Sequence, residues 1–410
     1  MRIGLFTDTY PPHINGVATS VLMLKTALEK KGHEVFIDTV NDDALEYKFE
    51  NDDTIIRIPG IPIGIYDYRL TGIYPVKAIN TIRKWNLDVI HSHTEFGVGT
   101  FARIISKQFN IPLIHTYHTM YEDYIHYITK GYFDKSSKKI VEYLTLFYCD
   151  KTANELIVPT KKTYDLFKEK YEVHKNVHIV PTGIEIDRFY EENVDKNKIK
   201  ELQKIYNISK KDITVIFVGR LAKEKNIEFL IRNHEELVKH NKNIKLLIIG
   251  DGPDMVEYGE LVKKLNLQNN IILGGKVPYA DIPCYYQLAD IFVTASTTET
   301  QGLTVIEAMA GGITPVCIKD ESFINVVIDD LNGKIFTNQE EYIKIMKDLM
   351  DNPKELERLS KQARLNAEGY SSKYYAERVL DVYKASQEKK KGFFRTMIDN
   401  LKGKDDDEDE

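Results

Sequence analysis

Residues 297–316 read TTETQGLTVIEAMAGGITPV, and this stretch indicates the fold more strongly than any other part of the chain. An apolar run at residues 290–295 precedes it and is typical of a buried strand. A turn at Gln301-Gly302 then leads into residues 305–310, which favour a helix. A strand, a tight turn and a helix N-terminus leave backbone N–H groups without intrahelical acceptors, and such groups can bind an anion.

Two carboxylates flank this predicted anion site, Glu299 in the turn and Glu307 eight residues later in the helix. Phosphate oxygens would repel carboxylates, so these side chains are better suited to accept hydrogen bonds from hydroxyl groups. Hydroxyl groups around a phosphate are typical of a sugar nucleotide. The alternative is a solvated glutamate in the turn and an ordinary glutamate on the helix surface.

Apolar runs alternate with amphipathic segments along most of the chain, which predicts an α/β protein with doubly wound parallel sheets. At 410 residues the chain exceeds the usual size of a single hydrophobic core, so two domains are expected. Pro181 and Gly183 interrupt the pattern at the predicted junction. The expected strands are residues 3–6, 34–37, 88–91, 112–115, 213–219, 245–250, 270–273 and 291–293, and the first expected helix is residues 17–31.

The composition, with 42% hydrophobic and 29% charged residues, is that of a folded soluble protein. The net charge of −6 includes the acidic run at residues 405–410, so the rest of the chain is nearly neutral and nucleic acid is not an expected partner. Three scattered cysteines, Cys149, Cys284 and Cys317, form no disulfide framework or metal-ligand spacing, which fits a reducing cytoplasm. The opening MRIGLFTDTY indicates a strand rather than a signal peptide, and no apolar run is long enough to span a membrane.

Arg220 and Lys225 follow the predicted strand at residues 213–219, in a strand-to-helix loop. A diphosphate at such a loop needs positive charge. Arginine binds two oxygens with its planar guanidinium, and lysine acts as a mobile point charge. The alternative is that both are surface cations, and Lys223 between them is expected to be exposed.

These residues, in this order, resemble a known family. Arg220 and Lys225, followed by Glu299 and Glu307 with seven residues between the glutamates, are similar to the donor site of the retaining GT-B glycosyltransferases of family GT4. The segment TETQGLTVIEAMA at residues 298–310 resembles the corresponding segment in the branch of the family that glucosylates diacylglycerol. The resemblance covers residues 1–388 and implies two Rossmann-like domains that face a cleft, with a C-terminal helix that crosses back to the N-terminal domain. The implied division is 1–182 for the acceptor and membrane side, 183–368 for the nucleotide sugar, 369–388 for the crossover helix, and 389–410 for a basic amphipathic segment with an acidic tail.

The resemblance also implies a role for each site residue. Glu299 would contact the donor sugar and Glu307 the ribose, while Arg220 and Lys225 would neutralise the departing diphosphate. The implied catalytic residues are His118, Arg220, Lys225 and Glu299. The implied donor-binding residues are Gly16, Arg220, Lys225, Gly252, Lys276, Val277, Glu299, Gln301, Gly302, Leu303, Thr304 and Glu307.

Four histidines close two neighbouring predicted strands, His91 and His93 after one and His115 and His118 after the next. A metal site is conceivable, but no cysteine or carboxylate cluster completes a usual ligand set, so no metal is expected. The resemblance places His118 beside the transferred sugar, with hydrogen-bonding and electrostatic roles, whereas His91 and His115 are expected to be structural. The predicted acceptor side consists of Asn15, His118, Tyr121 and Tyr124.

Two basic segments are candidates for contact with an anionic membrane. One lies at residues 129–139, and the other, KKKGFFRTMIDNLKGK at 389–404, would place its apolar residues on one helical face among six cations and one anion. The alternatives for the second segment are a partly disordered tail or a helix that docks on a partner. The predicted membrane residues are Lys130, Lys135, Lys138, Lys139, Phe393, Phe394, Met397 and Leu401.

The resemblance therefore implies a retaining enzyme that moves glucose from UDP-glucose to the 3-hydroxyl of 1,2-diacylglycerol. It would need no cofactor and no obligatory protein-bound Mg²⁺, and it would lie peripherally on the inner face of the cell membrane. The alternatives are a GT4 transferase with another hexose donor or with a polysaccharide or other lipid acceptor, a GT-B sugar-nucleotide epimerase, and a non-catalytic binding module.

Overall fold

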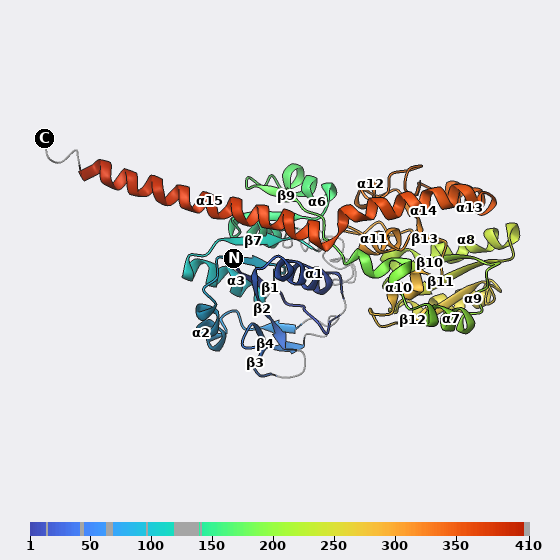
Figure 1. Cartoon of the computed structure of the whole chain (residues 1–410), viewed down its shortest axis with the longest axis horizontal. Helices are drawn as coiled ribbons and strands as arrows, with labels where there is room; N and C mark the ends of the chain where they lie inside the picture. The colour runs from blue at the N-terminus through green and yellow to red at the C-terminus, as the bar shows by residue number, and fades with distance from the viewer. Residues whose placement is uncertain are drawn as a thin grey trace. The chain divides into compact units, whose positions relative to one another are not determined.

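The structure is a computed structural model that describes residues 1–13, 15–41, 45–62, 69–95, 97–118, 139 and 142–405, with side chains as far as residue 390 except that of Leu70. The chain forms two compact units (Figure 1). Unit 1 contains Met1–Gly183 and Lys373–Glu410, and unit 2 contains Ile184–Ser372. The boundary between the first segment of unit 1 and unit 2 lies after Gly183, one residue later than the predicted boundary after residue 182.

Unit 1 is built on a mixed β-sheet whose described strands are β1 (Arg2–Phe6), β2 (Glu34–Asn41), β3 (Lys48–Glu50), β4 (Ile55–Pro62), β5 (Arg69–Thr71), β6 (Val89–Ser92), β7 (Leu113–Thr116), β8 (Glu155–Val158) and β9 (Val177–Ile179). Their order is β3-β4-β2-β1-β6-β7-β8-β9, and β5 pairs with β4. The strands run parallel, except that β3 and β5 are antiparallel to β4. The predicted strands β1, β2, β6 and β7 are confirmed, whereas the sequence did not predict the others.

The helices of unit 1 cover both faces of this sheet. Those whose full bounds lie in the described part of the chain are α1 (Gly16–Lys30), α2 (Val76–Trp85), α3 (Gly97–Phe109), α6 (Lys161–Asp165) and α15 (Ser372–Asp405), with π-helices at Phe147–Lys151 and Leu166–Lys170. One hydrophobic cluster joins β1 and α1 to α15, and a second joins the opposite side chains of β1 and β6 to α2 and α3. The predicted first helix is therefore confirmed at α1.

The C-terminal helix α15 belongs to the core of unit 1, although it follows unit 2 in the chain (Figure 1). Its residues Tyr375, Val379 and Tyr383 are buried against β1 and α1. The expected crossover helix at 369–388 and the separate segment after it are instead one continuous helix that begins at Ser372. The sequence has no proline between Ser372 and Asp405, so nothing forces the helix to end earlier.

Unit 2 is built on a parallel sheet with the described strands β10 (Ile213–Val218), β11 (Ile244–Ile249), β12 (Ile271–Gly275), β13 (Ile291–Thr294), β14 (Thr314–Ile318) and β15 (Lys334–Phe336). Their order is β12-β11-β10-β13-β14-β15. The predicted strands β10 to β13 are confirmed, and the sequence did not predict β14 and β15. The order reverses direction between β10 and β13, which makes this the topological switch point of the sheet.

Helices cover both faces of the unit 2 sheet because its strands are apolar on both sides. In β10, Ile216 and Val218 pack in one hydrophobic cluster, and Val215 and Phe217 pack in the other. The described helices of eight or more residues are α7 (Lys196–Ile205), α8 (Ile227–His240), α9 (Met255–Lys264), α11 (Leu303–Ala310), α13 (Gln339–Asp351) and α14 (Pro353–Ala367), and the shorter ones include α10 (Ile282–Tyr286) and α12 (Glu321–Ile324). Within the described part of the chain, no helix has both the length and the apolar character needed to cross a membrane.

Candidate functional site

The predicted donor residues of unit 2 lie at the carboxyl edge of its sheet, around the switch point. The loop after β10 carries Arg220 and Lys225, and the loop after β13 carries Glu299. Because β10 and β13 are hydrogen-bonded neighbours, these two loops begin side by side. Open α/β sheets bind their ligands at this position.

Lys225 and Glu299 form an ion pair across the switch point, through Lys225 Nζ and Glu299 Oε1. Their side chains are only 14% and 23% exposed. The backbone carbonyl of Glu299 accepts a hydrogen bond from Ser322 Oγ at the start of α12, which fixes the loop. The structure therefore brings together two residues that lie 74 positions apart in the sequence.

Arg220 pairs with Glu224 in the same loop, and the Arg220 side chain remains 30% exposed. Glu224 is almost fully enclosed, at 4% exposure, so it can orient the guanidinium while one face of that group stays accessible. Lys223 is exposed, as predicted. Of the three cations in this loop, the two predicted to bind phosphate are thus the two that the fold holds in place.

The turn before α11 requires a glycine. Gly302 has φ of +72°, and a Cβ at this position would lie 2.5 Å from Phe323 Cε1. The preceding Gln301 is buried. The N–H groups of Leu303 and Thr304 open the helix and have no intrahelical acceptor, so the predicted anion site would lie at this helix start.

Glu307 lies within α11 and is 5% exposed. The Tyr286 hydroxyl is 3.0 Å from its Oε2, and the Tyr279 hydroxyl is 3.5 Å from its Oε1, both placed to donate. Burial raises the pKa of Glu307 to about 7, although these hydrogen bonds and the charge of Arg188 act in the opposite direction. Glu307 is therefore a fixed acceptor whose charge changes near neutral pH.

The sequence did not single out Ser296 and Thr298, two further polar residues beside Glu299. Their hydroxyl oxygens are buried and have no hydrogen-bond partner among the described residues. Buried hydroxyls normally have partners, so both are suited to meet a polar ligand. No motif marks them, because serine and threonine are common in loops.

The other predicted donor residues follow β11 and β12. Gly252 lies against the backbone of the loop after β10, because a Cβ there would be 2.2 Å from Leu221 O. Lys276 is exposed, and Val277 is half-buried at the edge of a hydrophobic cluster. These positions complete the same edge of the sheet.

Unit 1 has its own switch point, between β1 and β6, and Asp8 connects the two loops there. Its carboxylate accepts hydrogen bonds from Thr94 Oγ1 at 2.5 Å and from the Val98 N–H at 3.0 Å. Burial raises the pKa of Asp8 to about 6. The sequence placed Asp8 in the correct loop but assigned it no role.

Asn15 and Gly16 lie at the start of α1. Asn15 Oδ1 accepts the Ala18 N–H at 2.9 Å and is the helix N-cap, and Asn15 Nδ2 donates to Thr9 Oγ1 at 2.8 Å. Gly16 is exposed, and a Cβ there would meet nothing within 4 Å. Asn15 thus has a clear structural function, while the space beside Gly16 is open.

The four histidines do come together at one edge of the unit 1 sheet. His91 is buried between Tyr383 Oη and Thr116 Oγ1, each at 2.6 Å, which agrees with a structural role. The rings of His91 and His93 lie 4.0 Å apart, and His93 Nδ1 is 3.0 Å from His118 Nε2. Burial lowers the pKa of His118 to about 4. A neutral His118 would act through hydrogen bonds rather than through charge.

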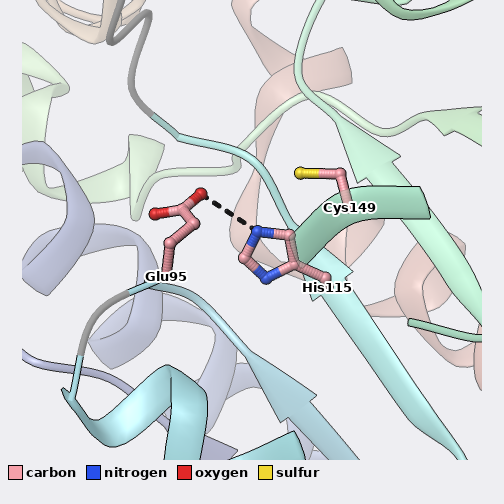
Figure 2. Close-up of side chains that lie close together, drawn as sticks. All are labelled: Glu95, His115 and Cys149. Carbon is pink, nitrogen blue, oxygen red and sulfur yellow. Dashed lines mark hydrogen bonds and ion pairs between the residues drawn. The ribbon is translucent and has the colours of Figure 1, made fainter. Parts of the chain in front are cut away.

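The expectation that no cysteine or carboxylate completes a ligand set with these histidines is wrong. His115 Nε2 is 3.0 Å from Glu95 Oε1, and Cys149 lies next to both (Figure 2). The three residues come from different parts of the chain, and only the adjacency of their strands and helix brings them together. Sequence spacing therefore could not reveal the group.

The predicted membrane and acceptor residues are only partly covered by the described part of the chain. Lys139 is described, and its side chain is exposed. The helical backbone predicted for the C-terminal basic segment is confirmed in α15. Phe393, Phe394, Met397 and Leu401 lie in that helix, beyond the described side chains. The predicted site residues that lie outside the described part of the chain are Tyr121, Tyr124, Lys130, Lys135 and Lys138.

Two families of known proteins match this chain, and together their matches extend over most of both units. The family described as Glycosyltransferase Family 4 matches residues 14–188, and the family described as Glycosyl transferases group 1 matches residues 198–366. The first match falls on unit 1 and the edge of unit 2, and the second lies within unit 2.

Two relatives carry the same name. The alpha-monoglucosyldiacylglycerol synthase of Acholeplasma laidlawii is 37% identical over 390 residues, which cover 93% of this chain and 96% of that protein. The protein of the same name from Streptococcus pneumoniae is 39% identical over 332 residues, which cover 80% of this chain and 74% of that protein.

Solved structures agree with the predicted GT-B fold. HepE from Anabaena, solved in complex with UDP-glucose, superimposes with a TM-score of 0.70 at 15% identity, covering 93% of this chain and 99% of that one. At this identity the likeness concerns the fold alone. Since the family matches span both units and a relative at 37% identity is covered almost completely, the chain belongs to the group 1 and family 4 glycosyltransferases.

Proposed function

We propose that the protein transfers glucose from UDP-glucose to the 3-hydroxyl of 1,2-diacylglycerol with retention of the anomeric configuration, forming monoglucosyldiacylglycerol. The names of the two relatives support glycolipid synthesis as the activity. The arrangement of charged groups in unit 2 supports a nucleotide sugar as the donor. The reaction needs no cofactor, and Mg²⁺ is not an obligatory ligand of the protein.

The observation that carries the proposal is the Lys225–Glu299 pair at the switch point of unit 2. An ammonium has three N–H donors, so a diphosphate at this edge can share Lys225 with Glu299. Arg220 has an accessible face for the same phosphates. Both cations would stabilise the negative charge that develops on UDP as the bond to glucose breaks.

The carboxylates would bind hydroxyl groups of the donor. Glu299 would orient the glucose, with the hydroxyls of Ser296 and Thr298 beside it. Glu307 is held by Tyr279 and Tyr286 and would accept a hydrogen bond from the ribose. His118 would donate or accept a hydrogen bond at the sugar, as a neutral imidazole.

The acceptor is a lipid, so the protein would work at a membrane surface, on the inner face of the cell membrane. The basic and apolar end of α15 would bind anionic lipid headgroups. The exposed Lys139 would add to this attraction.

Transfer assays on purified variants test the site. Lys225→Ala and Glu299→Ala should each lower kcat by about 10²-fold or more, because each removes a charged group aimed at the reacting donor. Lys223→Ala is the matched control, since Lys223 is an exposed cation of the same loop, and its kcat should stay within about twofold of the wild type. If Lys225→Ala retains most of its activity, the site assignment is wrong.

The substrates are tested separately. Radiolabelled UDP-glucose, UDP-galactose and GDP-mannose are each incubated with diacylglycerol in mixed micelles containing anionic lipid. Label should pass to lipid from UDP-glucose alone, and the product should carry an α-linkage by NMR. Transfer from GDP-mannose instead would replace the proposed donor, and donor hydrolysis without lipid labelling would replace the proposed acceptor.

A further inference from the structure

We propose that Glu95, His115 and Cys149 bind one Zn²⁺ ion inside unit 1. One ligand atom from each residue lies within 4.8 Å of the other two (Figure 2). All three residues are buried, with exposures of 5%, 0% and 0%. Figure 2 shows the carboxylate, the imidazole and the thiol directed toward a common point from three separate segments.

The donor set suits zinc. Thiolate, imidazole and carboxylate are its usual protein ligands, whereas Mg²⁺ and Ca²⁺ favour oxygen alone. With bonds of about 2.0–2.3 Å, a tetrahedral zinc places its ligand atoms about 3.4–3.6 Å apart. The observed atoms are close enough to reach that arrangement through side-chain rotation. Three protein ligands leave a fourth position for water or another donor.

The hydrogen bonds of His115 prepare it as a ligand. Its Nδ1 is 3.0 Å from the carbonyl oxygen of Ser92, which can only accept, so Nδ1 carries the hydrogen. The neutral ring then presents a lone pair at Nε2, 3.0 Å from Glu95 Oε1, which is also an acceptor. A cation between these two atoms satisfies both. Metal-binding histidines typically donate their other N–H to a carbonyl in this way.

The same three residue types could instead form a nucleophilic cysteine site, but the geometry does not favour it. An activated thiol needs a hydrogen bond to its imidazole base. The two ring nitrogens of His115 face Ser92 O and Glu95 Oε1, so neither nitrogen is directed at the Cys149 thiol. Cys149 is moreover fully buried, which denies a substrate access to its sulfur.

An ion here would connect three segments that are distant in sequence. Glu95 lies in the loop after β6, His115 in β7, and Cys149 in the π-helix Phe147–Lys151. Arg103 of α3 already joins the end of β6 to the π-helix, because its guanidinium donates to Ser92 Oγ at 3.1 Å and to Tyr148 O at 2.9 Å. Binding of Zn²⁺ releases the proton of the Cys149 thiol, and the bound ion with one carboxylate and one thiolate then has no net charge, so it does not suffer the burial cost of an isolated ion. An ion at this site would support the strand end that leads to His118.

The test uses untagged full-length protein stripped with EDTA and then titrated with Zn²⁺ or with Co²⁺ as a spectroscopic substitute. The wild type should bind one equivalent, show a thiolate-to-Co²⁺ charge-transfer band, and gain thermal stability with Zn²⁺. Cys149→Ser should lose the band and bind Zn²⁺ at least about 10-fold more weakly. Cys317→Ser, which changes a buried cysteine of unit 2, should behave as the wild type.

Two results would overturn the proposal. One is wild-type protein that binds no Co²⁺ through sulfur, which would mean that a proton rather than a metal lies between His115 and Glu95. The other is a charge-transfer band that survives in Cys149→Ser, which would place the metal at another thiol. The first measurement needs no variant, so it decides the question even if Cys149→Ser does not fold.

Discussion

At the residue scale, Glu307 shows how surroundings determine the charge of a binding group. Two tyrosine hydroxyls hold its carboxylate inside unit 2, and burial raises its pKa to about 7. The folded protein therefore holds this proton more tightly than the unfolded chain does. As the pH rises from about 4.5 to about 7, the carboxyl of Glu307 ionises in the unfolded chain but still holds its proton in the folded protein. Unit 2 loses stability over this interval because the unfolded chain gains the free energy of ionisation.

Glu307→Gln should remove this dependence on pH. The variant should match the wild type in stability near pH 5 and exceed it at pH 8, by no more than about 3 kcal/mol for the shift involved. Calorimetric unfolding of both proteins from pH 5 to pH 8 measures the difference. The exposed Glu257→Gln is the matched control. A constant difference between Glu307→Gln and the wild type at all pH values would contradict the assigned pKa.

The site residues that could be identified from the sequence are those in loops that directly follow strands with clear apolar runs. Arg220, Lys225 and Glu299 meet because β10 and β13 pair, and both strands were predictable. The partners of Cys149 were not predictable, because Glu95 lies 54 residues earlier in the sequence. That contact depends on where a π-helix packs, and π-helices leave no reliable pattern in sequence.

At the scale of elements, the short strands were the hardest to predict. β14 contains Pro315, and proline usually argues against an interior strand. Nevertheless β14 pairs with β13 on one side and β15 on the other. β3, β5, β9 and β15 have three residues each, too few for a periodic pattern to emerge. The parallel strands at the centre of each sheet have continuous apolar runs, and these determined the predicted fold, whereas the longer β4 (Ile55–Pro62) includes Arg57, Pro59 and Gly60 and was not predicted.

The turn that starts α11 allows a direct test of this element. Gly302→Ala should destabilise the protein by about 1–3 kcal/mol and weaken UDP binding, because alanine disfavours φ of +72° and its Cβ would collide with Phe323. Urea unfolding and titration calorimetry with UDP measure the two effects.

Two further variants separate the causes. Adding Phe323→Leu to Gly302→Ala should relieve the collision and recover part of the stability, but not the part lost to backbone conformation. Gly311→Ala at the other end of α11 should be tolerated, because φ there is −69° and no neighbour lies closer than 3.4 Å to the added Cβ. Equal losses at Gly302 and Gly311 would show that the turn has no special requirement.

At the scale of the whole molecule, each unit has hydrophobic clusters of its own. Unit 2 is a single continuous segment, whereas unit 1 is completed by α15. Lys389 near the end of this core ion-pairs with the buried Glu155 at 2.6 Å, and His178 contacts the same carboxylate at 2.8 Å. The part of α15 that supports the fold therefore extends further than the predicted limit at residue 388.

Two truncations should separate folding from membrane binding. A chain ending at Lys390 keeps the Lys389–Glu155 pair and should unfold as the full chain does, while losing most of its sedimentation with anionic vesicles. A chain ending at Glu388 should lose that binding and also about 1–2 kcal/mol of stability, because Glu155 loses one of its partners. Neutral vesicles serve as the control for charge. Undiminished binding of the Lys390 truncation would rule out the end of α15 as the anchor.

The return of α15 to unit 1 also has a consequence for biosynthesis. A ribosome completes Met1–Gly183 first, but Tyr375, Val379 and Tyr383 emerge only after all of unit 2. At about 5–20 residues per second, the first-made half of the protein waits on the order of 10–40 s for its last core helix. During that interval unit 2 can fold on the nascent chain, while the first half still exposes an apolar surface. The part made first is thus the part finished last, and it is where a chaperone would be needed.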